Sequence, residues 1–386
     1  MGYATKLVAW GRDTALPFWL ERGWDQQSGG FLEVVDLDGA PLVDTPRRVR
    51  VQARQIYVYA RAEHEGWCKG LDRAAEAMAL LEKRAFSPDG APGWVHRLDA
   101  TGDVLSPVRD LYDHAFILLA LSWMYRVTGE AHYMSLIEQT LAFLDTHMSA
   151  PDRGFVESIG AAQLPRRQNP HMHLFEAMMA LYEATGDAGV LDRIRTLRGL
   201  FDDIFFDPDA GVLREFFAEG WQRDTRPIGD HVEPGHLAEW VWLLAEQARV
   251  TGDAADMAAI RALYDTVCTK GISDVTGGLF TTCTAEGDVV DSGTRAWMQT
   301  EWIRAAAVFT KRGADEAESR LEQACKAMFD IHLDPALAGG WIDQTDAKGN
   351  PTVTNMPSST LYHALGAVLE ARAVVTSTGQ PTETQV

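Results

Sequence analysis

The chain alternates between two kinds of helix-length segment that differ in how their hydrophobic positions are distributed. One kind is apolar on nearly every side, as at 115–121 and 237–245, whereas the other carries charges along one side, as at 191–198 and 316–327. A helix that is apolar all round must be covered by other parts of the protein, while an amphipathic helix can face solvent. The pattern therefore predicts an inner and an outer layer of helices.

A turn that joins a glycine to an apolar residue recurs six times along the chain. Its glycines lie 57 to 67 positions apart and are Gly30, Gly93, Gly154, Gly211, Gly278 and Gly340. A regular period of this length is typical of repeat architectures. With two helices in each period, we expect an all-α (α/α)6 barrel of six helical hairpins, with inner helices that begin near residues 48, 108, 169, 233, 292 and 356. A linear solenoid is the alternative architecture, but closure of the ring removes both exposed ends.

The domain organisation predicted from this pattern is simple. No linker rich in Pro or Ser divides the chain, so residues 1–375 are expected to form one catalytic domain. The polar stretch 376–386 has too few hydrophobic residues to bury and is predicted to be a disordered tail.

The net charge of −20 narrows the classes of partner. Nucleic acids and anionic membranes both require a basic surface, so neither is expected. The same charge argues against a multiply phosphorylated substrate, although a local arginine cluster could override it. No run approaches the roughly 20 apolar residues that span a bilayer, and the N-terminus lacks the hydrophobic segment of a signal peptide. The four cysteines form no C-x-x-C pair and suit a reducing compartment, so we expect a cytoplasmic protein.

Candidate functional residues follow from the expected direction of the inner helices. Because these helices all run the same way, their N-terminal ends meet at one mouth of the barrel, and functional residues should lie in their first two turns. Polar residues that interrupt apolar segments there are Arg54, Asp113, His114, His173, His236, Glu239, Glu301 and His363. Polar groups that converge on an apolar mouth are typical of a small-molecule site.

Several of these residues have a purely structural alternative. A single histidine on an apolar helix is often a hydrogen-bonded core residue, as we expect for His171. Arg54 could close an ion pair with a barrel carboxylate, and Asp113 could act only on a helix dipole. Glu239 lies three residues after His236 on the same helix face and could orient that imidazole.

The tryptophans offer flat apolar faces on which a sugar ring could stack. Trp240 and Trp242 lie within an apolar inner segment and are expected to be core residues. Trp94, Trp297 and Trp341 are the better candidates for a sugar platform. With Arg54, Asp113 and Glu301, Trp94 and Trp297 make up the expected substrate-binding set.

Five segments together resemble signature blocks of the N-acylglucosamine 2-epimerase superfamily. They are 51–59, 169–177, 233–240, 297–301 and 358–363, and the likeness runs in order from about residue 4 to 374. The resemblance implies an (α/α)6 barrel and a metal-free interconversion of sugars at C1 and C2. It implies that His236 and His363 are the acid/base pair, that His173 and Glu239 support ring opening or orientation, and that Arg54 holds substrate oxygens.

Within this superfamily, Trp240 and the Gly-Trp-Ile-Asp loop at 340–343 are most similar to the mannose isomerase branch, and Met298 departs from the usual pattern. An isomerase moves a proton from C2 to C1 through a cis-enediol. A histidine can act as base and then as acid near neutral pH. We expect His363 to carry this proton, Arg54 to stabilise the enediolate, and His236 to act on the ring or carbonyl oxygen. A sugar 2-epimerase that uses the same two histidines on opposite faces of C2 is the alternative.

Two other classes of protein are less favoured. A glycosidase would use two carboxylates, drawn from Asp113, Glu176, Glu239 and Glu301, and would leave the histidines without a role. A carbohydrate-binding protein would need no histidine pair. The residue types of His173, His236 and His363 would also suit a zinc site, yet we expect no metal and no cofactor. The expected partner is a monosaccharide, and a homodimer is allowed for.

Overall fold

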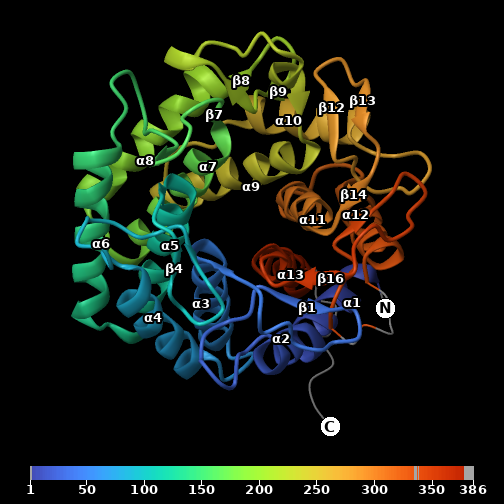
Figure 1. Ribbon diagram of the computed structural model, residues 1–386. Coiled ribbons are helices and arrows are strands. Elements are labelled where there is room, and N and C mark those ends of the chain that lie inside the picture. Colours follow the sequence, from blue (N-terminus) through green and yellow to red (C-terminus); the bar gives the residue numbers. More distant parts are fainter. Residues whose placement is uncertain (1, 334–336, 338, 378–386) are drawn as a thin grey trace.

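Two concentric rings of helices form the molecule in the computed structural model, which describes residues 2–333, 337 and 339–377 (Figure 1). The inner ring comprises α3 (Val49–His64), α5 (Leu111–Thr128), α7 (Gln168–Thr185), α9 (Pro234–Thr251), α11 (Ala296–Thr310) and α13 (Thr360–Ser377). Each of these helices begins within four residues of its expected start. The predicted (α/α)6 barrel is therefore confirmed.

The outer ring consists of helices that cover the inner ones. They are α4 (Leu71–Ala85), α6 (Ala131–Phe143), α8 (Ala188–Leu200), α10 (Met257–Lys270) and α12 (Ala317–Ile331), together with α1 (Tyr3–Trp10) and α2 (Leu16–Arg22), which a π-helical turn at Gly11–Ala15 joins into one helix. In α4 the buried residues are Ala74, Ala77, Met78, Leu81 and Ala85, which follow one helical face. In α11, by contrast, every residue except the last is buried. The difference in hydrophobic pattern thus separates the two rings, as predicted.

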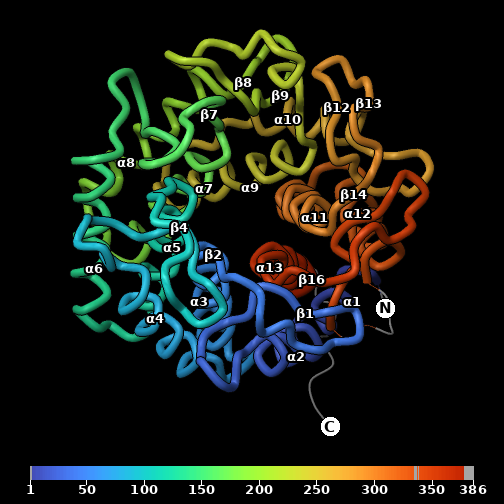
Figure 2. Tube along the Cα trace, in the orientation of Figure 1, coloured from blue at the N-terminus to red at the C-terminus, as the bar shows by residue number. Residues whose placement is uncertain are grey.

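The ring closes where the first and last repeats meet. Helix α13 packs against α11 on one side and α3 on the other, so that the first and last inner helices lie side by side (Figure 2). Close to this contact, β1 (Val34–Asp36) pairs with β16 (Asn355–Pro357) in an antiparallel ladder. The alternative of an open solenoid is therefore wrong.

A collar of short strands at the barrel mouth was not predicted from the sequence. The strand before each inner helix pairs with a strand in the loop of the following repeat. Besides β1 with β16, the pairs are β2 (Arg47–Arg48) with β3 (Arg97–Leu98), β5 (Arg109–Asp110) with β6 (Ser158–Ile159), β7 (Arg166–Arg167) with β10 (Phe216–Phe217), β11 (His231–Val232) with β12 (Thr282–Thr284), and β14 (Thr294–Arg295) with β15 (Gln344–Thr345). Two more strands, β4 (Val104–Ser106) and β13 (Val289–Asp291), add a third strand to the β2–β3 and β11–β12 pairs, and β8 (Phe206–Asp207) with β9 (Val212–Leu213) forms a separate hairpin. The collar ties neighbouring repeats together at the end where the inner helices begin.

The recurring glycine turns are held by side chains of the inner helices. The backbone N–H of Trp94 donates to His114 Nε2 at 3.1 Å, and that of Phe155 donates to His171 Nε2 at 3.1 Å. Burial lowers the pKa of His114 to about 4 and that of His171 to about 3, so both imidazoles are neutral acceptors. At Gly93, φ is +87°, a left-handed conformation that favours glycine. The structural interpretation of His171 is confirmed, and His114 has the same role.

The C-terminal boundary needs one correction. Helix α13 continues through Ser377, and the Thr376 hydroxyl donates to the Arg372 carbonyl at 2.9 Å. Thr376 and Ser377 therefore belong to the barrel and not to the predicted tail, whose remaining residues 378–386 lie outside the described part of the chain. Among the described helices, none is long and apolar enough to cross a membrane.

Candidate active site

A cavity of about 450 Å³ opens at the end of the barrel where the inner helices begin, and all six contribute to its wall. Among the candidate residues, Arg54, His173, His236, Glu239, Trp297 and His363 line it. Of the eight polar residues predicted to converge at the barrel mouth, the structure brings five together at the cavity: Arg54, His173, His236, Glu239 and His363. They come from the third to sixth residues of their helices, because the strand collar sets where each helix starts.

His363 is held by a buried carboxylate. Its Nδ1 lies 2.7 Å from Glu301 Oε1, and Arg304 donates to both Glu301 oxygens at 3.0 and 2.8 Å. Burial lowers the pKa of His363 well below its ordinary value, and the positive charges of Arg54 and Arg304 lower it further. The imidazole is therefore neutral at physiological pH, with Nε2 free to act as a base.

His236 has the opposite electrostatic environment. Its Nδ1 lies 3.0 Å from Glu215 Oε2, and its Nε2 lies 2.9 Å from the side-chain amide of Asn169. Burial by itself would lower the pKa of His236, but the carboxylates of Glu215 and Glu233 outweigh it and raise the pKa to about 10. His236 is thus a charged acid at the pH where His363 is a neutral base.

Trp297 separates these two histidines. Its ring centroid lies 5.1 Å from that of His236 and 5.4 Å from that of His363. A sugar that contacts the exposed part of this indole would have one imidazole on each side. The expectation that Trp297 lines the site is met.

Arg54 reaches the cavity without an opposing carboxylate. Its Nη2 donates to the Tyr112 hydroxyl at 2.7 Å, and its guanidinium lies 4.2 Å from the centroid of the Phe116 ring. No ion pair joins Arg54 to any carboxylate in the described part of the chain, so that alternative is wrong. The Tyr112 hydroxyl is also 3.2 Å from His173 Nε2. Burial lowers the pKa of His173 to about 3, although the Glu176 carboxylate 3.7 Å from its Nδ1 acts in the opposite direction, so His173 is neutral.

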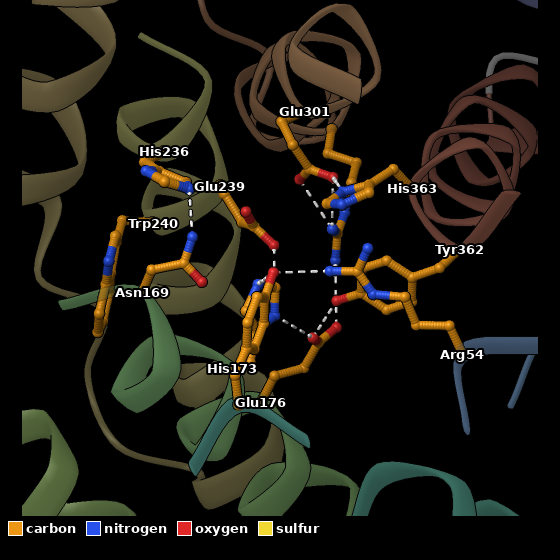
Figure 3. A network of polar contacts seen from close by, with 12 residues as sticks. Arg54, Asn169, His173, Glu176, His236, Glu239, Trp240, Glu301, Tyr362 and His363 are labelled. Atoms are coloured by element: carbon orange, nitrogen blue, oxygen red, sulfur yellow. Dashed lines mark hydrogen bonds and ion pairs between the residues drawn. The ribbon is translucent and has the colours of Figure 1, made fainter. Parts of the chain in front are cut away.

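A layer of buried charges lies beneath the cavity (Figure 3). Arg304 pairs with Glu301 and, at 3.6 Å, with Glu176, which also accepts a hydrogen bond from the Tyr362 hydroxyl. Burial raises the pKa of Glu301 to about 7 and that of Glu239 well above its ordinary value. Burial also opposes ionisation of Glu176, but His173, Arg304 and Tyr362 together lower its pKa. Arg304 is thus the cation that holds this layer together.

Glu239 does not orient His236, contrary to one sequence-based interpretation. The carboxylate lies 3.9 Å from His173 Nδ1 and makes no hydrogen bond or ion pair with His236 in the described chain. Glu215 orients His236 instead. Glu215 lies in the loop after Gly211, outside the inner helices, so the rule that restricted candidates to helix starts excluded it.

Three further expectations are corrected because the side chains concerned do not reach the cavity. Asp113 is fully buried, 2.6 Å from His96 and 3.2 Å from Arg50. Trp94 is fully buried, and its indole donates to Thr140 at 3.0 Å. Trp341 stacks on Trp19 with centroids 4.7 Å apart. Trp94 and Trp341 follow turns, and their side chains are fully buried in the core. Asp113 follows a helix start, and its carboxylate is enclosed by its partners His96 and Arg50. Glu301 likewise acts on the site only through His363.

Sequence reasoning missed four residues that shape the site: Tyr112, Asn169, Glu215 and Arg304. For Asn169 and Arg304, the sequence contains a feature that could have identified them as site residues. Asn169 begins one of the five signature segments, and Arg304 follows Glu301 by three residues on an otherwise apolar helix, where an unpaired charge would be costly. Tyr112 had none, since a tyrosine on an apolar helix is ordinarily a core residue.

Some histidine, glutamate and aspartate side chains lie in groups whose nitrogen and oxygen atoms are of the kinds that bind metal ions. The described residues contain four such groups, each with a single histidine: His96 with Asp110 and Asp113, His173 with Glu176 and Glu239, His236 with Glu215 and Glu233, and His363 with Glu239 and Glu301. A three-histidine zinc site is not formed among these residues. In the last group, Glu301 is already neutralised by Arg304.

The barrel and its histidine pair define an enzyme of the sugar isomerase and epimerase class, and the comparisons with known proteins agree. The family model described as N-acylglucosamine 2-epimerase (GlcNAc 2-epimerase) matches residues 29–367. The chain belongs to this family.

Individual relatives cover nearly the whole chain. A Rhizobium meliloti (strain 1021) protein named mannose-6-phosphate isomerase is 36% identical, over 95% of this chain and 96% of its own. A Thermobifida fusca protein named D-mannose isomerase is 28% identical, over 89% of this chain and 88% of its own. The structure of cellobiose 2-epimerase from Bacillus thermoamylovorans B4167 superposes with a TM-score of 0.83 at 21% identity, covering 95% of this chain and 99% of its own. That structure supports the fold.

Proposed function

We propose that the protein is a metal-independent aldose–ketose isomerase that interconverts D-mannose, or a close relative of it, with D-fructose. The observation that carries the proposal is the opposed state of the two histidines that flank Trp297, a neutral His363 and a charged His236. The names of the R. meliloti and T. fusca relatives support a mannose-type sugar.

The proposed reaction begins with ring opening. The charged His236 donates a proton to the ring oxygen while the anomeric hydroxyl gives up its proton to solvent, which later returns a proton to His236; the result is the open-chain aldose with its carbonyl at C1. An imidazolium is a competent general acid for this step. Asn169 and His173 both belong to α7 and line the cavity, where they can hold the hydroxyl group that ring opening forms.

Proton transfer between the two carbons follows. His363 Nε2 removes the proton from C2, the electron pair forms the C1–C2 double bond, and the C1 oxygen becomes an enediolate oxygen that Arg54 stabilises. His363 then returns the same proton to C1, while the C2 oxygen gives up its proton and the C1 oxygen gains one. Glu301 stabilises the imidazolium that exists between these steps, because its carboxylate lies 2.7 Å from Nδ1.

Metal independence is part of this proposal. The positive charge that the enediolate needs is supplied by Arg54, which has no carboxylate partner in the described chain, and the acidic proton is supplied by His236. We expect full activity after exhaustive treatment with a chelator. Activity lost to the chelator and restored by one stoichiometric metal would contradict this part.

The 2-epimerase alternative uses the same residues differently. After His363 has removed the C2 proton, His236 would return a proton to the opposite face of C2. The placement of one histidine on each side of Trp297 favours this alternative geometrically. However, in the reverse epimerisation His236 would have to remove the C2 proton as a base. Its pKa of about 10 makes the neutral form of His236 scarce at neutral pH. We therefore favour isomerisation.

Turnover in D₂O distinguishes the two reactions. D-mannose and the enzyme are followed by ¹H and ¹³C NMR. The isomerase should form fructose labelled at C1, to an extent limited by exchange of the His363 proton with solvent. Glucose labelled at C2 as the main early product would contradict the isomerase and support the epimerase.

The setting of the enzyme completes the proposal. We propose that the barrel acts as one catalytic domain in the cytoplasm, which the absence of disulfides among the four described cysteines supports. A glycosidase is not favoured, because Glu176 and Glu301 are engaged by Arg304 and do not line the cavity.

A further inference from the structure

Arginine side chains are concentrated at the cavity of a protein whose net charge is −20. The arginines that line it are Arg48, Arg50, Arg54 and Arg295, and the carboxyl groups are Glu233, Glu239 and Asp343. Burial raises the pKa of all three carboxyl groups, whereas a guanidinium stays charged. Arg48 pairs with Glu33 and Arg50 with Asp113, so Arg54 and Arg295 are the two guanidinia of the cavity wall that have no ion pair in the described chain.

Two of these arginines lie at the rim and not in the reactive layer. Arg48 is the N-cap of α3 and Arg295 is the N-cap of α11. They precede Arg54 and Glu301, respectively, by six residues. Six helical residues rise about 9 Å, so the backbone of the rim arginines lies about 9 Å nearer the N-terminal end of each helix than that of Arg54 and Glu301.

The rim arginines flank the start of α13. This helix lies between α11 and α3 (Figure 1), and the charges of Arg48 and Arg295 both act on Asp343. Asp343 Oδ1 accepts a hydrogen bond from the hydroxyl of Thr360, the first residue of α13, at 2.8 Å. The two guanidinia therefore face one region of the cavity from either side of a helix N-terminus, where negative charge is favoured.

Arg295 lacks the partner that equivalent arginines have. In the first repeat, the N-cap residue Arg48 pairs with Glu33, which follows Leu32. In the third repeat, the N-cap residue Arg167 pairs at 2.9 Å with Glu157, which follows Val156. The backbone N–H groups of Leu32, Val156 and Phe280 make corresponding bonds to the ends of the preceding outer helices. The residue after Phe280 is Thr281, so this position carries no carboxylate in the fifth repeat.

The side chain of Arg295 consequently has no hydrogen bond or ion pair within the described chain, and its Nε is buried without a partner. A half-buried guanidinium whose N–H groups have no hydrogen-bond acceptor in the described part of the protein is costly in the free enzyme. Its contact with an anionic ligand would remove that cost.

We propose that Arg295, assisted by Arg48, binds a phosphate group on the terminal carbon of the sugar, at the end opposite to C1 and C2. The inference deepens the proposed function and rests on it for the orientation of the sugar, with C2 at His363. Guanidinia bind phosphate oxygens in bidentate fashion. Arg295 contributes more than Arg48, because Glu33 competes for the latter.

Kinetics with two sugars test this subsite. D-mannose 6-phosphate should have a kcat/KM at least about tenfold above that of D-mannose, since one charge-assisted contact is worth a tenfold preference or more. Arg295→Gln should reduce this preference at least about tenfold, and Arg48→Gln should reduce it less. Arg167→Gln is the matched control for Arg48→Gln, because it removes the same type of N-cap ion pair at a residue that does not line the cavity. Its preference should equal that of the wild type.

Binding without turnover separates this proposal from the proposed function. Calorimetry compares mannitol 6-phosphate with mannitol, and D-mannuronate supplies a terminal carboxylate in place of phosphate. Tighter binding of the hexitol phosphate that is lost in Arg295→Gln supports the subsite, even if neither hexose is isomerised. Equal affinity for both hexitols, an unchanged preference in Arg295→Gln, or a stronger preference for the carboxylate would overturn it.

Discussion

At the scale of single residues, the chemistry depends on how burial and neighbouring charges act on two similar imidazoles. His363 and His236 are both buried, and burial alone would make both neutral. The difference arises from their neighbours. His363 faces the guanidinia of Arg54 and Arg304, whereas His236 lies between the carboxylates of Glu215 and Glu233. These different neighbours make the imidazole of His363 a base and that of His236 an acid.

Replacement of His363 tests its role as the proton carrier. His363→Gln should lower kcat by at least about 10²-fold, because proton transfer is lost, while the affinity for a non-reacting hexitol should survive. NMR turnover and calorimetry measure the two quantities. His132→Gln, at an exposed histidine on α6, serves as the control and should behave like the wild type. A His363→Gln enzyme with near-full kcat would show that the assignment is wrong.

The pH dependence of kcat/KM should report the opposed histidines. Activity should fall at acid pH as His363 takes up a proton, and should fall at alkaline pH as His236 loses its proton near its pKa of about 10. Glu215→Gln removes one carboxylate beside His236, so its pKa should decrease and the alkaline limb should move to lower pH. The acid limb, which belongs to His363, should stay in place. An alkaline limb unchanged by this substitution would contradict the role of Glu215.

At the scale of elements, the inner helices carry a buried charge layer that supports the site. Arg304 on α11 is fully enclosed and compensates Glu301 on its own helix and Glu176 on α7. Gly366 on α13 leaves the room for it, since a Cβ there would lie 3.1 Å from Arg304 Nε. Three inner helices therefore depend on one guanidinium.

Arg304→Met should destabilise the protein by about 3–5 kcal/mol, because it leaves buried carboxylates without a cation. Arg304 helps lower the folded-state pKa of Glu176, so the stability that this carboxylate contributes is present above its unfolded pKa and is lost as pH falls. The difference from the wild type should therefore be largest near neutral pH and smaller in acid. Denaturant unfolding at several pH values measures it, with the exposed Arg312→Met as control.

At the scale of the whole molecule, the barrel is closed by contacts between its first and last repeats. Val35 in β1 is fully buried and pairs with Met356 in β16. Since each repeat is covered by its neighbours, loss of this closure should affect the entire ring rather than one hairpin.

Val35→Asp should therefore destabilise the protein by at least about 3 kcal/mol, the cost of a buried unpaired charge. Far-ultraviolet circular dichroism and tryptophan fluorescence should give one coincident transition at a lower Tm. Val289→Asp places the same charge on β13, where the valine is 45% exposed, and should change the Tm little. A first transition confined to the N-terminal hairpin would contradict the closed cooperative unit.

Much of this organisation could be predicted because it depends on periodic patterns in the chain. The all-round apolar character of segments such as 237–245 identifies inner helices, and the six glycine turns count the repeats. Arg54, His173, His236, Glu239, Trp297 and His363 were found at the cavity because a polar residue in an apolar helix start is a local signal. The family resemblance assigned their expected roles.

The sequence by itself therefore determined the barrel, the number of its repeats and the end at which its site lies. Only the tertiary structure decided which residues act on one another across repeats. Glu215 reaches His236 from a loop, Arg304 joins α11 to α7, and Trp94 turns away from the cavity into the core. Arg295 is left without a carboxylate because its neighbour in the fold is Thr281. Periodicity follows from the geometry of single helices, whereas these contacts depend on side-chain direction and on the strand collar that sets where each helix begins.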